Sequence, residues 1–243
     1  MRFRVLTYNI HRAIGLDRQF RPDRIIEIIG HYQPDVALLQ EVDEGVPRSR
    51  EIDMARELAQ ALEFPHLAIG HNVSLRKGRY GNATLSRHPI VRERNIDLTI
   101  GGRKRRGCQH TTLAGPAGAP VEVFNVHLGL SARERLAQLM LLVRSHEFAA
   151  LDENITCLVA GDFNDWRSAL RVAFTDGLRF DCASDRRGRP LRSIKTYPAF
   201  SPSGGLDKIY HRGPLRLLSA RACGLSLARV ASDHLPLVAD FEL

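Results

Sequence analysis

The stretch I-T-C-L-V-A-G-D-F-N-D, residues 155–165, joins a mostly apolar run to a polar ending. The run Ile155–Ala160 predicts a buried strand that ends at the edge of a sheet. Asp162 and Asn164 stand two positions apart, so on an extended segment their side chains point to the same side. One could accept a proton from water while the other donates a hydrogen bond. The alternative is an Asx turn between strand and helix, with Asp165 as the cap of that helix.

Polar residues end or interrupt apolar runs at five other places. The motifs are T-Y-N-I, L-L-Q-E-V-D, N-V-H-L, G-L-D-K-I-Y and S-D-H-L-P, and they contain Asn9, Glu41, Asn125, His127, Asp207, Asp233 and His234. One such residue alone is usually a turn or cap residue. Six strand ends that converge would instead form a pocket of carboxylates, imidazoles and amides, which metal-assisted phosphoryl chemistry requires.

Glu41 follows an apolar run and offers a hard oxygen ligand of the kind that Mg²⁺ or Mn²⁺ prefers. The alternative is a surface carboxylate at a strand end, and Asp43 and Glu44 are nearby competitors for the role. Asn9 could orient the Glu41 carboxylate or contact the metal, although a lone asparagine at a strand end is more often a turn residue.

Asp233 and His234 are adjacent, so their side chains face different ways and His234 needs an orienting acid from elsewhere. Asp207 is the obvious candidate, because an Asp–His pair holds the tautomer and favours the imidazolium. His127 is a second imidazole, and Asn125 shares its side of the strand. The alternative for a lone histidine such as His127 is a hydrogen-bonded core residue.

The spacing of apolar residues predicts an α+β fold. Strands are expected at Phe3–Tyr8, Val36–Leu39, Ala83–Leu85, Val121–Val126, Thr156–Ala160, Leu206–Tyr210 and Leu235–Phe241. Helices are expected at Arg24–His31, Glu51–Leu62 and Ser131–Leu151, the last opened by a capping box of Ser131 and Glu134. With no internal repeat or linker, residues 1–243 are expected to form one domain of two mixed or mostly antiparallel sheets, packed face to face with helices outside.

The bulk composition of the 243 residues sets broad limits. A net charge of +8 favours polyanionic partners, or else lies on ordinary solvated faces. The four cysteines form no C-x-x-C pair, so zinc knuckles and redox motifs are not expected. No apolar run approaches the ~20 residues of a membrane span, and the first ten residues do not look like a secretory signal, so we expect a cytoplasmic protein without a transmembrane segment.

The ordered combination of Q-E, G-D-F-N and S-D-H resembles the endonuclease/exonuclease/phosphatase superfamily, and the match extends from Phe3 to Phe241. Members include deoxyribonucleases, apurinic endonucleases, neutral sphingomyelinases and inositol-polyphosphate phosphatases. The resemblance implies a four-layered α/β sandwich of two packed mixed sheets flanked by helices, with the active site at one end of the sheets.

The resemblance also implies roles for the polar residues. Glu41 would be the principal ligand of Mg²⁺, or of Mn²⁺ in its place, with Asn9 beside it. Asp233 would lie at the metal site as a ligand or just behind the ligands. Asp162 would orient or deprotonate the attacking water, and Asn164 would hold a non-bridging phosphate oxygen.

Two histidines would act on the phosphate. His234, paired with Asp207, would contact the scissile phosphate, and His127 would donate to phosphate or protonate the leaving oxygen. Apurinic endonucleases usually have Tyr in place of His127 and Arg in place of Leu206. The motifs T-Y-N-I-H, Tyr80–Ile90 and N-V-H-L instead resemble small bacterial members nearer to the sphingomyelinase and deoxyribonuclease branches.

Weaker candidates for phosphate contact are Asn125, Arg87 and Arg106. The basic loops 76–79 and 103–106 could follow a nucleic-acid backbone or a lipid headgroup surface, or could be solvated hairpin tips.

The expected function is Mg²⁺-dependent hydrolysis of a phosphate ester by in-line attack of water, by a monomer. The first choice is a phosphodiesterase that cleaves DNA or RNA, as an endo- or exonuclease. The alternatives are a phosphodiesterase acting on sphingomyelin or another phospholipid, with anionic phospholipid as a partner, and a small-molecule phosphatase. A binding module that has lost catalysis is the remote alternative.

Overall fold

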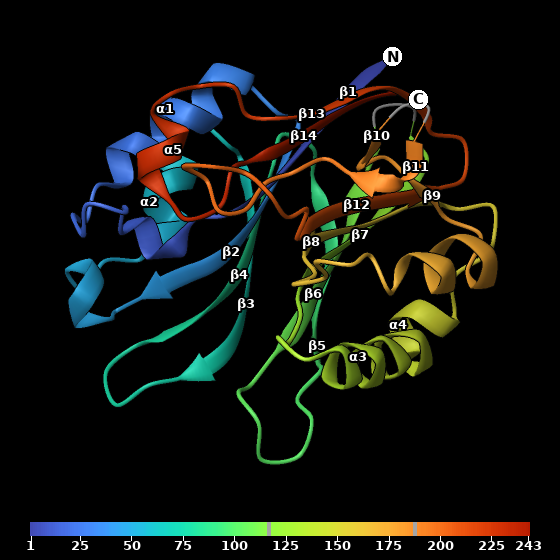
Figure 1. Cartoon of the computed structure of the whole chain (residues 1–243), viewed down its shortest axis with the longest axis horizontal. Helices are drawn as coiled ribbons and strands as arrows, with labels where there is room; N and C mark the ends of the chain where they lie inside the picture. The colour runs from blue at the N-terminus through green and yellow to red at the C-terminus, as the bar shows by residue number, and fades with distance from the viewer. Residues whose placement is uncertain (116–117, 187–188) are drawn as a thin grey trace.

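Two six-stranded sheets pack face to face in the computed structural model, which describes residues 1–115, 118–186 and 189–243 (Figure 1). The first sheet has the order β13-β14-β1-β2-β4-β3, and the second has the order β5-β6-β7-β8-β12-β9. Each sheet contains one parallel pair, β1 with β2 and β7 with β8, while its other pairs are antiparallel. The two packed mixed sheets expected from the sequence are therefore confirmed.

The strands of the first sheet are β1 (Arg2–Asn9), β2 (Val36–Glu44), β3 (His66–Ser74), β4 (Arg79–Ser86), β13 (Arg216–Ala222) and β14 (Leu237–Glu242). Those of the second are β5 (Ile90–Asp97), β6 (Gly107–Ala114), β7 (Pro120–His127), β8 (Thr156–Asp162), β9 (Asp181–Cys182) and β12 (Asp207–Arg212). A small hairpin is formed by β10 (Asp185–Arg186) and β11 (Arg189–Ser193).

Helices cover the outer face of each sheet and complete four layers (Figure 1). The first sheet is covered by α1 (Pro22–Tyr32), α2 (Met54–Ala61) and α5 (Ala228–Ala231), and the second by α3 (Ala132–Arg144) and α4 (His146–Ala149). Three apolar clusters lie between successive layers, and the middle cluster joins the inner faces of the two sheets. None of the helices described is long and apolar enough to cross a bilayer.

The helix boundaries differ from the sequence prediction at two places. The second helix begins at Met54 rather than Glu51, because the Asp53 side chain accepts a hydrogen bond from the Arg56 main chain. Ser131 caps α3 as predicted, by accepting from the Glu134 main chain. That helix then ends at Arg144 and not near residue 151, because Ser145 is extended and caps the separate helix α4.

The inward-facing positions of the central strands change from apolar to polar along each strand. In β8, for example, Leu158 and Ala160 belong to the core between the sheets, and Asp162 occupies the next inward position. The parallel pairs end at the same side, and β12 begins where β8 ends. The polar inward residues are Asn9 on β1, Gln40 on β2, Asn125 and His127 on β7, Asp162 on β8 and Asp207 on β12.

Asn125 joins the two sheets through a buried amide. Its Nδ2 donates to the main-chain oxygens of Leu39 (3.2 Å) and Ala83 (3.0 Å), and its Oδ1 accepts from Gln40 Nε2 (2.8 Å). Its main-chain oxygen accepts from Asn82 Nδ2 (2.9 Å). The four partners belong to β2 and β4, so these bonds set the position of one sheet against the other.

Asn125→Ala should lower the free energy of unfolding by about 3 kcal/mol, because it leaves several buried polar groups without partners. Urea unfolding measures the change. The matched control Asn154→Ala removes an exposed amide and should change stability by less than about 0.5 kcal/mol. Equal stabilities for the two variants would contradict the bridging role of Asn125.

Asp240 on β14 forms ion pairs with several arginines, at the end of the first sheet opposite to Asn9. Its carboxylate accepts hydrogen bonds from Arg2 (3.1 Å), Arg4 (2.6 Å), Ser219 (2.9 Å) and Arg221 (3.1 Å). Burial alone would raise the pKa of Asp240, but these donors lower it well below its ordinary value. The network ties β13, β14 and β1 together.

A depressed carboxylate pKa adds stability that is present above the unfolded-state pKa of ~4 and is lost as the pH falls below it. Asp240→Asn should therefore cost about 2 kcal/mol of unfolding free energy at pH 7, and the difference from the wild type should shrink at pH 3. Urea unfolding at both pH values tests this. Glu242→Gln, which alters an exposed ion pair on the same strand, is the control. A deficit for Asp240→Asn that stays constant with pH would refute the account.

Candidate active site

Asp162 lies at the centre of the polar end of the sandwich. The strand register places His127 and Asp207 on either side of it, as its direct partners on β7 and β12. From the facing sheet, Asn9 Nδ2 donates to Asp162 Oδ2 (3.0 Å). Residues 9, 127, 162 and 207, which are remote in the sequence, thus meet at one place, as the sequence predicted for its strand ends.

The G-D-F-N segment forms a tight turn after β8. The Asn164 main-chain N–H donates to Asp162 Oδ1 (2.9 Å), and Asn164 has a φ of 50°. The extended arrangement expected for this pair is therefore wrong, and the Asx turn weighed against it is present. The Asn164 Nδ2 donates to the Leu128 carbonyl (2.9 Å), which leaves its second N–H available to a ligand.

His234 is oriented by the acid that the sequence predicted. Its Nδ1 lies 2.9 Å from Asp207 Oδ2, and its Nε2 lies 3.7 Å from Asp162 Oδ2. Ser232 fixes the loop before β14, because its hydroxyl donates to the Asn9 carbonyl (2.7 Å) and accepts from the His234 main chain (3.2 Å). The Asp207–His234 pair is therefore held against the end of β1.

The two imidazoles carry different charges. Burial would lower the pKa of His234, but Asp207 and Asp162 raise it to about 10, so it is an imidazolium at neutral pH. Burial and the cations Arg106 and Lys104 lower the pKa of His127 well below its ordinary value, so it is neutral. Burial also raises the pKa of Asp162 to about 6, against the opposing effect of His234.

Glu41 stands on a bulge within β2, which continues beyond it to Glu44. The pairing with β4 shifts between Leu39 and Val42, and Glu41 has a φ of 57°, which L-residues rarely adopt. Bulges re-aim side chains, and this one follows directly on Gln40, the β-sheet partner of Asn9. Arg12 Nε lies 3.4 Å from the partly exposed Glu41 carboxylate.

Asp233 lies next to His234 in the sequence, and Arg106 lies near His127. Asp233 is partly exposed, and the Ser232 hydroxyl lies 3.4 Å from its Oδ1. Arg106 is only 6% exposed and lines a small pocket with His127. Among the residues that the structure describes, its Nε has no hydrogen-bond partner.

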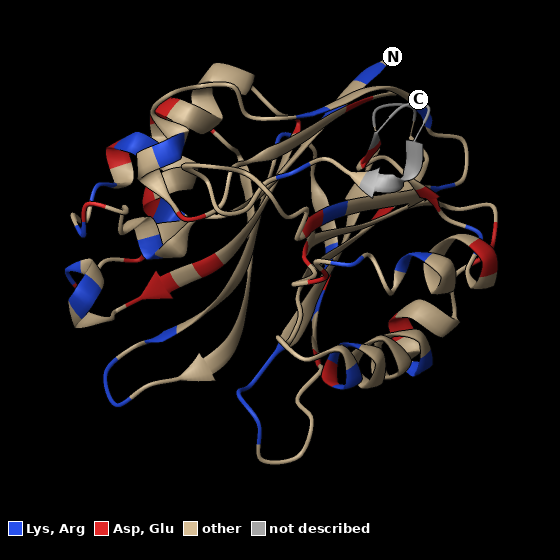
Figure 2. Ribbon diagram, in the orientation of Figure 1, with Lys and Arg blue, Asp and Glu red and all other residues tan. Residues whose placement is uncertain are grey.

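The basic loops 76–79 and 103–106 connect β3 to β4 and β5 to β6, and both project from the same end of the molecule (Figure 2). Lys104 Nζ lies 5.5 Å from the Tyr80 ring centroid, which bends the second loop back toward the first. Arg76, Lys104, Arg105 and Arg106 form no ion pair with any carboxylate in the described part of the chain.

Two of the weaker phosphate candidates do not belong to this site. Asn125 is fully buried, and its side-chain amide is occupied by the bonds between the sheets. Arg87 lies at the far end of β4, where its guanidinium stacks on Phe64 and its Nε donates to the Pro34 carbonyl. Sequence alone could not separate these cases, because both residues follow or interrupt apolar runs.

A metal ion could meet two sets of ligands here. The ligand atoms of Asp162, Asp207 and His234 lie within 4.8 Å of one another. Within this set the His234 ring already has carboxylate neighbours, because its Nδ1 lies 2.9 Å from Asp207 Oδ2 and its Nε2 lies 3.7 Å from Asp162 Oδ2. The carboxylates of Glu41 and Asp233 are partly exposed, and with the amide of Asn9 they offer the hard oxygens that fit Mg²⁺ or Mn²⁺.

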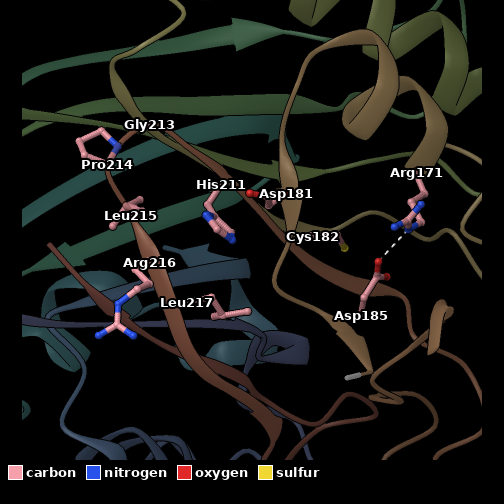
Figure 3. Close-up of a pocket in the computed structure, with 10 residues that line it drawn as sticks. All are labelled: Arg171, Asp181, Cys182, Asp185, His211, Gly213, Pro214, Leu215, Arg216 and Leu217. Carbon is pink, nitrogen blue, oxygen red and sulfur yellow. Dashed lines mark hydrogen bonds and ion pairs between the residues drawn. The ribbon is translucent and has the colours of Figure 1, made fainter. Parts of the chain in front are cut away.

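A cleft of about 760 Å³ lies elsewhere in the described structure. Figure 3 shows it between the open edges of the sheets, with His211 and Cys182 on one side and Arg216 and Leu217 on the other. None of the predicted site residues lines it.

Three residues of the site were missed by the sequence analysis. Arg12 pairs with Glu41, and the Tyr197 ring centroid lies 4.9 Å from that of His234. Trp166 stacks edge-on against Tyr197. Trp166 directly follows G-D-F-N-D, which was the one available signal, whereas nothing in the sequence places Arg12 or Tyr197 at the site.

Comparison with known proteins gives consistent results. The model of the Endonuclease/Exonuclease/phosphatase family matches residues 6–234. The Escherichia coli K12 protein YbhP is 32% identical over 254 residues, which cover 99% of this chain and 96% of YbhP.

Two solved structures share the fold. TDP2 of D. rerio, complexed with a single-strand DNA product, aligns with a TM-score of 0.76 at 18% identity, over 100% of this chain and 99% of TDP2. A mannosyl-6-phosphatase of Bacteroides thetaiotaomicron aligns with a TM-score of 0.76 at 17% identity, over 99% of this chain and 100% of the phosphatase.

Ser232→Ala should lower the unfolding free energy by about 1–2 kcal/mol, because it removes the buried hydroxyl that links β1 to the His234 loop. It should also perturb the NMR signals of His234. The control Ser201→Ala, at an exposed position, should change neither the unfolding free energy nor these signals. Unaltered His234 signals in Ser232→Ala would show that Ser232 does not position this imidazole.

Proposed function

Because the chain belongs to the endonuclease/exonuclease/phosphatase family, whose members are phosphoesterases, we propose that it is a metal-dependent phosphodiesterase. Residues 1–243 form its one catalytic domain in this proposal. The observation that carries it is the convergence on Asp162 of Asn9 and Asp207 with two histidines, His127 and His234, in different charge states.

Asp162 receives the proton of the attacking water. Its raised pKa, about 6, lies close to neutral pH, which suits a general base. Asn9 and the Asn164 main chain each donate to one of its oxygens and so fix the direction of its remaining lone pairs. Water held there faces the phosphate in line with the leaving oxygen.

Glu41, Asn9 and Asp233 would hold Mg²⁺, for which Mn²⁺ could substitute. When bound, the cation would neutralise phosphate charge and stabilise the leaving oxygen. The bulge and the positive φ at Glu41 take its carboxylate out of the regular inward and outward alternation of β2.

Four side chains donate to charge that develops on the phosphate. The His234 imidazolium contacts a non-bridging oxygen through Nε2, and the free N–H of Asn164 contacts another. His127, which is neutral, donates to the phosphate or to the leaving oxygen. Arg106 is a buried guanidinium that forms no ion pair with any carboxylate the structure describes, and an oxyanion beside it would compensate its charge.

Nucleic acid is the substrate we favour. Arg76, Lys104, Arg105 and Arg106 are free of ion pairs with described carboxylates and lie on loops beside the site, which suits a chain of phosphates better than a single one. The single-strand DNA product bound to TDP2 supports the same choice, whereas the mannosyl-6-phosphatase makes a small phosphate ester the second candidate. An anionic phospholipid is the third.

Cleavage of single-stranded and plasmid DNA, phospholipid vesicles and a sugar phosphate, each with Mg²⁺, Mn²⁺ or EDTA, tests the proposal. We expect metal-dependent cleavage of DNA that falls steeply with salt, as for a protein that binds several phosphates. Asp162→Asn should lower kcat about 10³-fold, and Glu41→Gln should raise the Mg²⁺ concentration needed for half-maximal rate.

Glu93→Gln is the matched control, because it changes an exposed carboxylate on β5 to an amide. It should leave the rate within about twofold of the wild type. If Asp162→Asn is as active as Glu93→Gln on every substrate, the assignment of Asp162 as the base is wrong. Rapid, salt-insensitive cleavage of the sugar phosphate alone would favour the small-molecule phosphatase.

A further inference from the structure

An exposed aromatic side chain stands next to the proposed active site. Trp166, the only tryptophan of the chain, is 53% exposed and directly follows the turn that carries Asp162 and Asn164. Its ring centroid lies 5.6 Å from that of Tyr197, at an interplanar angle of 87°. The Tyr197 centroid lies 4.9 Å from that of His234. The Tyr197 ring therefore lies between the Trp166 indole and the His234 imidazole, which is proposed to contact the phosphate.

The indole is held in place although half of it faces solvent. A Cβ at Gly204 would lie 2.5 Å from Cε3 and Cζ3 of Trp166, so the ring packs on the bare backbone there. Gly204 and Tyr197 form a β-bridge in which the main-chain N–H of each donates to the other (2.8 and 3.0 Å). Trp166 and Tyr197 therefore form a fixed aromatic platform and not a mobile surface side chain.

The surroundings of this platform indicate what it binds. Its polar neighbours would hold the scissile phosphate of the proposed function. The basic loops 76–79 and 103–106 project together from one end of the molecule, and Lys104, Arg105 and Arg106 of the second loop have no carboxylate ion-pair partner in the described part of the chain. A flat aromatic surface beside a track for phosphates is the arrangement that binds unpaired bases, since every base offers a π face. In a duplex those faces are covered by neighbouring bases.

We propose that the Trp166–Tyr197 platform stacks the base of the nucleotide attached to the scissile phosphate, so that the enzyme prefers single-stranded or unpaired nucleotides. This specificity rests on the proposed phosphodiesterase function and narrows its substrate class. Trp166 contacts the base directly, and Tyr197 supports Trp166 from behind while it packs against His234.

The single tryptophan allows a direct test of binding. In Asp162→Asn, which should not turn over substrate, Trp166 fluorescence is measured during titration with a short single-stranded oligonucleotide. The same titration uses an abasic strand of equal length and charge. We expect saturable quenching by the first and not by the second. Equal quenching by both strands, or quenching only by anionic phospholipid vesicles, would overturn base stacking.

Measurement of cleavage rates provides a second test of base stacking. Trp166→Ala should lower kcat/KM on the base-containing strand about 10- to 100-fold and leave cleavage of the abasic strand unchanged, since stacking on an aromatic side chain is worth about 1–3 kcal/mol per base. Trp166→Phe should recover most of the loss. Val91→Ala, at an exposed apolar position on β5, is the matched control.

Failure of this inference can be told apart from failure of the proposed function. If the wild type and Trp166→Ala cleave both strands equally well, the phosphodiesterase stands and the platform is refuted. If neither strand is cleaved but quenching still depends on the bases, the platform is supported and the hydrolysis is refuted.

Discussion

The amide of Asn125 is the contact on which the site depends, because it ties the two sheets together at the end where their cores become polar. Its N–H groups donate to one main-chain carbonyl of β2 and one of β4, and its side-chain oxygen accepts from Gln40. These bonds set the position of one sheet relative to the other. Asn9 and Asp162 belong to different sheets, and only a fixed separation allows the 3.0 Å hydrogen bond between them. An apolar core alone would not specify that separation, since apolar contacts have no direction.

This arrangement gives each ionisable group a different charge within one small space. Burial favours the neutral form of carboxylates and imidazoles, so a buried histidine stays charged only where carboxylates face it. His234 keeps its proton because two carboxylates face it, and His127 loses its proton because it is buried and also faces cations. Burial raises the pKa of Asp162 to about 6, against the opposing effect of His234. One site can therefore accept a proton and donate hydrogen bonds at the same pH.

Much of the fold and most of the site could be predicted from the sequence, because both depend on short-range patterns. Short apolar runs located the central strands, and the polar residues that end or interrupt these runs gave Asn9, Asp162 and Asp207. The remainder depends on register and local backbone geometry. The bulge at Glu41 and the left-handed Asn164 follow from contacts with neighbouring strands and loops. Asn125 and Arg87 looked like site residues because the sequence shows only that a polar residue follows or interrupts an apolar run. It does not show whether that residue lies between the sheets, at the active-site end or at the opposite end.

The most direct test of the central claim, that these strand ends surround one phosphoryl-transfer centre, is a crystal structure with Mn²⁺ and inorganic phosphate, in which anomalous scattering locates the metal. We predict Mn²⁺ on the carboxylate of Glu41 with Asn9 beside it, and phosphate between Asp162, His234 and Arg106. Mn²⁺ bound by His234 and Asp207, or phosphate in the separate cleft at His211, would contradict the account.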